Sequence, residues 1–156
     1  MSNAFAGLIE ALSIHVNVKL AIENDVKVQA DFDDFALLIE YLPGPDQVLL
    51  AAAIADIPEG NRLALYRDIL KGQFIFKETL GASLALDPAE QFICLQTLQP
   101  LPALTRDTFP GLVENFLNVA ELWRKRCLPP TEPESSPEAG LPSPSSSPEA
   151  PGFLRV

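Results

Sequence analysis

The residues that could carry out acid–base or nucleophilic chemistry are few in this sequence, and they stand apart from one another. His15 is the one histidine of the chain, and no serine, cysteine or carboxylate lies near it at a recognisable catalytic spacing. A general base acts only when its partner group is within hydrogen-bonding reach. We therefore expect His15 to be a surface or core residue, and we expect the chain not to be an enzyme.

Two other short motifs could hold an ion or a phosphate. The stretch Asp31-Phe-Asp-Asp34 is the densest acidic cluster, but it lacks the glycine and the distal glutamate of a calcium loop, so a solvated turn between strands is the better interpretation. The stretch Leu80-Gly-Ala-Ser-Leu84 has too few glycines for a phosphate-binding loop and no following Lys-Ser/Thr. The sequence therefore predicts no metal site, no nucleotide site and no cofactor.

Cys94 and Cys127 are the two cysteines, and neither has the spacing of a metal ligand. We expect both to be free thiols in a reducing compartment, although a bridge between them stays open as an alternative.

The overall charge excludes some classes of partner. The formal net charge is −10 and the sequence pI is about 4.4, so nucleic acid and anionic membrane surfaces would be repelled. The first residues lack the charged flank and long apolar centre of a signal peptide, and no apolar run approaches the roughly 18 residues of a membrane span. We expect a cytoplasmic protein.

Composition divides the 156 residues into two parts. Residues 1–128 are long enough for one domain with its own core. Residues 129–156 are rich in proline and serine and have too few apolar groups to offset the entropy of ordering, so they are predicted to be a disordered tail. Phe153-Leu-Arg-Val156 is the only apolar cluster of the tail. It could be a short docking peptide or an incidental end.

Apolar periodicity predicts the elements of the domain. Helical spacing marks a short first helix with Ser2 or Asn3 as its cap, a second helix over 62–71 with Asn61 as its cap, and a last helix that begins at Phe109 and ends before Pro129. Alternation marks strands over 26–32 and 35–42, and a hairpin of 83–86 with 91–98. The alanine-rich segment 47–57 favours helix by local propensity, and its periodicity does not decide.

The strands 35–42 and 91–98 are apolar on both faces, and such strands need cover on both sides. The three modest helices that the sequence predicts can cover these strand faces only to a limited extent. A dimer interface or a bound partner segment would provide the rest, and a fully covered monomer is the alternative.

The element order, together with Ser83-Leu-Ala-Leu-Asp-Pro before a strand and Phe116-Leu-x-x-Ala-x-x-Trp-Arg near the end, resembles the class I type III secretion chaperones of the Tir chaperone (CesT) family. The resemblance runs from about residue 4 to residue 127. It implies an α+β fold of order α-β-β-β-α-β-β-α, in which helices pack on an antiparallel sheet and residues 47–57 form the third strand.

The resemblance also implies two binding surfaces. One is a homodimer interface around the second helix and the region after it, at Leu65, Tyr66, Ile69, Leu70, Phe74 and Phe76. The other is a groove that holds an extended segment of a secreted effector, at Phe5, Leu8, Ile9, Leu12, Val28, Phe35, Leu37 and Ile39. Edge-strand pairing would supply affinity there, and apolar pockets would select anchor residues.

The leading hypothesis is a type III secretion chaperone of a bacterial cytoplasm, which binds the N-terminal chaperone-binding segment of a secreted effector and keeps it soluble and export-competent. One alternative is a regulatory relative that binds an anti-activator and couples secretion to transcription. Another is a small ligand-binding domain. Two features depart from the family pattern: the long proline-serine tail, and Lys71-Gly72 where many members have an asparagine-containing turn.

Overall fold

The protein is built around one five-stranded antiparallel sheet. A computed structural model describes residues 3–32 and 35–128; the predicted tail lies outside the described residues. The strands run in the order β1-β2-β3-β5-β4 across the sheet. Their bounds are β1 Lys27–Phe32, β2 Phe35–Leu42, β3 Gln47–Asp56, β4 Ser83–Leu86 and β5 Phe92–Pro100.

The helices follow the order that the sequence predicted. They are α1 Asn3–Val16, α2 Arg62–Gly72 and α3 Phe109–Cys127, and two single 3₁₀ turns are added, η1 Phe74–Phe76 and η2 Leu101–Ala103. The predicted α+β fold of order α-β-β-β-α-β-β-α is thereby confirmed. The segment that propensity left undecided is strand β3, which lies between β2 and β5; it pairs with β5 along its length and with β2 over residues 47–52.

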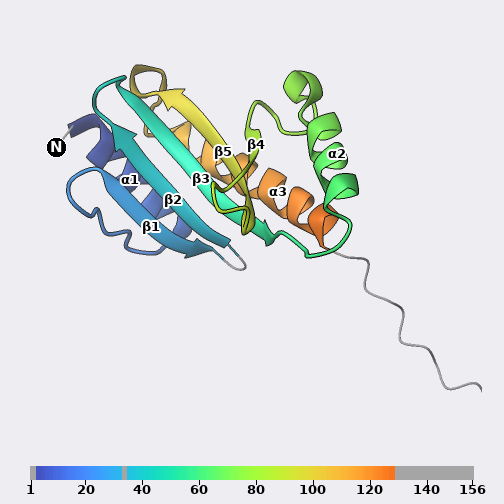
Figure 1. The fold of residues 1–156 in the computed structure, drawn as a ribbon. Helices are drawn as coiled ribbons and strands as arrows, with labels where there is room; N and C mark the ends of the chain where they lie inside the picture. The colour runs from blue at the N-terminus through green and yellow to red at the C-terminus, as the bar shows by residue number, and fades with distance from the viewer. Residues whose placement is uncertain (1–2, 33–34, 129–156) are drawn as a thin grey trace, which may run out of the picture.

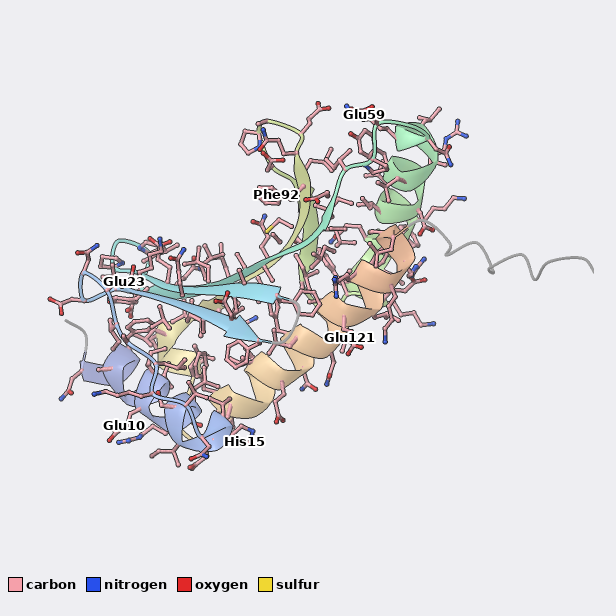
Figure 2. The ribbon with its side chains drawn as sticks, turned by 90° about the horizontal axis from the view of Figure 1, so that it is seen from below. Glu10, His15, Glu23, Glu59, Phe92 and Glu121 are labelled. Atoms are coloured by element: carbon pink, nitrogen blue, oxygen red, sulfur yellow. The ribbon has the colours of Figure 1, made fainter. Side chains whose placement is uncertain are left out.

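Helices α1 and α3 cover one face of the sheet and leave the other face without helices (Figure 1). The view of Figure 2 places both helices on the same side of the strands. The covered face holds the core, where alternate side chains of each central strand are buried together with the apolar stripes of α1 and α3. Phe5, Leu12, Phe109 and Trp123 in these helices are fully buried.

Helix α2 lies beside the C-terminal end of α3, far from strands β1 and β2 (Figure 1). Trp123 joins the two regions: its Nε1 donates a hydrogen bond to the carbonyl of Glu78 at 3.2 Å. The guanidinium of Arg126 lies 4.1 Å from the centre of the Trp123 ring. Arg126 also pairs with Asp68 of α2 at 3.2 Å and with the carboxylate of Glu78, so one cluster fixes α2 and the segment after it to α3.

Two turns show how local chemistry sets the ends of elements. Asn61 occupies the cap position of α2 with a left-handed φ of 58°, but its side chain makes no capping hydrogen bond. The predicted side-chain cap is therefore wrong, because the left-handed backbone is not the extended one that a capping side chain requires. In the β4–β5 turn, the carboxylate of Asp87 accepts hydrogen bonds from the backbone N–H groups of Phe92, Gln91 and Ala89, and these bonds lower the pKa of Asp87.

Candidate protein-binding surfaces

The residues with catalytic or metal-binding chemistry are dispersed over the surface. His15 is exposed at the end of α1, and its Nε2 lies 2.7 Å from Oε1 of Glu114 on α3. In Figure 2, His15 lies at the end of α1 that is next to α3. This contact ties α1 to α3 on the covered side of the sheet and brings no nucleophile to the histidine. Within residues 3–32 and 35–128, no group of three or more His, Cys, Asp or Glu side chains could hold a metal ion; Asp33 and Asp34 lie outside the described residues.

The two cysteines are free thiols in different surroundings. Cys94 is half-buried in β5, and burial raises the pKa of its thiol. Cys127 is buried at the end of α3, where burial and then the negative charge of Asp68 raise the pKa of its thiol to about 11. A raised pKa leaves little thiolate at neutral pH, so neither thiol is set up as a nucleophile.

The face of the sheet opposite α1 and α3 is apolar in its centre, and we call it the open face. Pairing registers align Leu38, Ala51 and Gln96 across β2, β3 and β5. The next row aligns Glu40 with Leu49 and Leu98. These side chains are half-buried or exposed, and Leu98 is 50% exposed. The prediction that β2 and β5 are apolar on both faces therefore corresponds to one face in the core and one in solvent.

The eight residues predicted to line an effector groove lie together on the covered side of the sheet. None is more than 7% exposed, and all belong to one core cluster: Phe5, Leu8, Ile9, Leu12, Val28, Phe35, Leu37 and Ile39. Leu8 and Phe35 also line shallow surface cavities, whereas a bound segment would reach the other six only if a covering helix moved. That they line a groove stays a prediction.

The predicted dimer residues fall into two groups. Leu70, Phe74 and Phe76 are exposed, and Phe74 is 73% exposed. Tyr66 and Leu65 are half-buried, and Ile69 is buried against the core. The hydroxyl of Tyr66 is buried without a hydrogen-bond partner. The three exposed residues stand on α2 and on the turn after it, in a region with little cover.

This region carries further exposed apolar residues that the sequence interpretation missed. Leu63 precedes Leu70 by seven residues and lies on the same side of α2. Ile75 is 68% exposed and Leu80 is 72% exposed. We call Leu63, Leu70, Phe74, Ile75, Phe76 and Leu80 the α2 patch. Helical spacing could have indicated Leu63, whereas Ile75 and Leu80 follow no periodic pattern.

The backbone of the α2 patch is strained at several residues. Ile75, Phe76 and Leu80 have φ values of 51°, 54° and 51°. This left-handed conformation is a true outlier for a β-branched residue such as Ile75. Each such residue costs about 1 to 3 kcal/mol unless its surroundings compensate. Exposed apolar side chains on strained backbone are typical of a surface that a partner covers.

These features define a class of protein: a small α+β domain with one helix-covered face, one open apolar face and a separate apolar patch on its second helix. The chain belongs to the Tir chaperone protein (CesT) family, whose pattern matches residues 7–124. This confirms the resemblance seen in the sequence, and the family and fold are those of chaperones.

Solved structures of low sequence identity share the fold. A chain of the ExsC–ExsE complex is 18% identical with a TM-score of 0.67, and the match covers 86% of this chain and 97% of that one. A chain of the HopA1–SchA chaperone–effector complex is 17% identical with a TM-score of 0.65, covering 78% and 94%. A chain of the ExoT–SpcS complex from Pseudomonas aeruginosa is 15% identical with a TM-score of 0.60, covering 78% and 98%.

Curated proteins give no match to the sequence. In the part of the chain that the structure describes, none of the helices has the length and apolar content that a membrane span requires.

Proposed function

We propose that this protein is a non-enzymatic type III secretion chaperone of the bacterial cytoplasm, which binds the N-terminal segment of a secreted effector in extended form and keeps it soluble. Membership of the Tir chaperone family supports this proposal, as does the similarity of fold to a chain of the HopA1–SchA chaperone–effector complex. The observation that carries it is the open face, an apolar sheet surface without helices.

The open face suits a segment without fixed structure. Its centre is built from small side chains, with Ala51 and Ala53 on β3, so a bound backbone can approach closely. Leu38 and Leu98 stand on either side of this strip and offer contacts for apolar anchors of the partner. Such a surface binds many sequences that place apolar residues at intervals, which is the property a chaperone needs.

The test uses the full-length protein and the N-terminal region of a secreted protein encoded beside it. Leu98→Asp places a charge on the open face, and we expect binding to weaken about 10- to 100-fold, the equivalent of about 1.5 to 3 kcal/mol for one buried leucine. Ile14→Asp is the matched control, since Ile14 is 72% exposed on α1 at the other side of the sheet. Equal binding by Leu98→Asp and wild type would remove the open face from the proposal.

We further propose that the functional unit is a homodimer joined through the α2 patch. The six exposed residues of this patch would bury their side chains against a second copy, and this burial would offset the backbone strain at Ile75 and Phe76.

Sedimentation analysis separates the two surfaces. Phe74→Glu should convert the dimer to a monomer, while Leu98→Asp should leave the dimer intact and affect only effector binding. If Phe74→Glu and wild type sediment alike, the α2 patch is not the interface.

A further inference from the structure

A groove on the helix side of the sheet lies apart from the open face and meets the α2 patch at one residue, Leu80. Its largest cavity, about 600 Å³, lies between the first half of α3 and the end of β5. Strand β4 pairs only with residues 93–96 of β5, so the rest of that edge has no neighbouring strand. Thr97 and Gln99 on the uncovered end of β5 face Leu112 and Phe116 of α3 across this cavity.

One buried polar group also lines this cavity. Thr79 is 1% exposed, and its hydroxyl has no hydrogen-bond partner. A buried hydroxyl without a partner is unfavourable by about 1 to 3 kcal/mol. The hydroxyl itself has almost no accessible surface, but Thr97, Gln99 and Asn115 also line the cavity and offer polar groups, which favours a polypeptide over a purely apolar molecule.

Two further cavities lie along α3 toward the point where the chain leaves the described structure. A second cavity of about 520 Å³ shares Leu80 and Val119 with the first and extends to Arg126. A third, of about 310 Å³, shares Arg126 with the second and is lined by Leu128, the last described residue. The path from Leu128 back to Asp107 follows α3, a distance of roughly 30 Å at 1.5 Å per residue.

We propose that Phe153-Leu-Arg-Val156 of this same chain binds in the first cavity. Phe153, Leu154 and Val156 supply apolar side chains for Leu112 and Phe116. Arg155 supplies a positive charge for Asp107, which is the one charged residue that lines the cavity.

The intervening residues 129–152 have a suitable length for this connection. Even fully extended in the proline-type conformation, 24 residues reach at most roughly 75 Å, which exceeds the roughly 30 Å length of the groove. A tether that can span the distance holds residues 153–156 near the groove at an effective concentration on the order of millimolar. The tail then acts as an intramolecular ligand that any other polypeptide must displace from α3. The open face stays free, so this inference does not depend on effector binding there.

Photo-crosslinking of the full-length chain tests the proposal. Phe153 is replaced by p-benzoylphenylalanine, and equal amounts of unlabelled and isotope-labelled chains are mixed before irradiation. We expect crosslinks within one chain to peptides that contain Leu104, Leu112 or Phe116. Crosslinks between chains, crosslinks to the open face, or an absence of crosslinks to the groove would each overturn it.

A charge exchange gives a second readout that does not depend on folding. Asp107 is exposed, so Asp107→Arg should leave the fold intact and lower the yield of this crosslink about two- to fivefold, the range of one surface ion pair. Combining Asp107→Arg with Arg155→Asp should restore the yield. A yield that Asp107→Arg leaves unchanged, or that the double variant fails to restore, would contradict the assigned position of Arg155.

Discussion

The contact between Gly72 and Trp123 allows one substitution to be worked out from the structure. A Cβ atom added to Gly72 would lie 2.0 Å from Cη2 and 2.1 Å from Cζ2 of Trp123. This is about 1.4 Å short of ordinary van der Waals contact. The indole cannot move aside, because Trp123 is fully buried, donates its N–H to the Glu78 carbonyl and packs under Arg126.

Gly72→Ala must therefore displace the end of α2 or the indole itself. Overpacking of this size in a closed core should lower the free energy of unfolding by about 2 to 4 kcal/mol. For a domain of this length, each kcal/mol corresponds to about 3 to 5 °C in Tm. Because the α2 patch begins on the same helix, we also expect the variant to weaken the proposed dimer.

Urea unfolding followed by the fluorescence of Trp123, the only tryptophan of the chain, measures this loss. All samples need the same protein concentration, since the stability of a dimer depends on it. Gly111→Ala on α3 is the matched control, because nothing lies within 4 Å of its added Cβ, and its stability should be unchanged or higher by up to about 1 kcal/mol. A Gly72→Ala protein within about 0.5 kcal/mol of wild type would refute the reasoning.

Two further results concern the same corner and the open face. Arg126→Ala removes two ion pairs and the contact with Trp123. Because the guanidinium is partly exposed, the free energy of unfolding should fall by about 1 kcal/mol in low salt and by less in high salt. A loss that does not depend on salt would point to packing alone. Raised thiol pKa values predict slow alkylation of Cys94 and Cys127 at pH 7 that accelerates about tenfold per pH unit below each pKa. Saturation with an effector segment should slow alkylation of Cys94 only, as measured by mass spectrometry, and equal slowing of both would contradict binding at the open face.

The local spacing of apolar residues was sufficient to predict the elements that are apolar along one side or along their whole length. The stripe of α3 and the apolar run of β2 predicted both elements with nearly the observed bounds. Segment 47–57 could not be assigned in this way, because its alanines favour helix while its position between β2 and β5 supplies hydrogen bonds on both edges. Tertiary pairing overrides propensity in a central strand.

The candidate surfaces were less accessible to sequence reasoning. Alternation in β2 separates Phe35, Leu37 and Ile39 from Ala36 and Leu38, but it does not say which set the helices cover. In the structure, the helices cover the bulkier set, since larger side chains gain more from full burial.

The exposed turn after α2 shows a different limit. Ile75 and Phe76 adopt left-handed backbone that their residue types disfavour, so residue type would not predict this turn. The bond between Trp123 and the Glu78 carbonyl spans 45 positions, and such a contact leaves no local pattern.

In the proposed function, stability and recognition depend on opposite faces of one sheet. On the covered face, Leu37 and Leu95 are buried in the core. Truncation of either side chain would leave a cavity that the surrounding core fills only partly. On the open face, residues such as Leu98 already meet solvent, so their replacement changes the recognised segment at little cost in folding. The strands can therefore keep their core while their outward residues change with the partner.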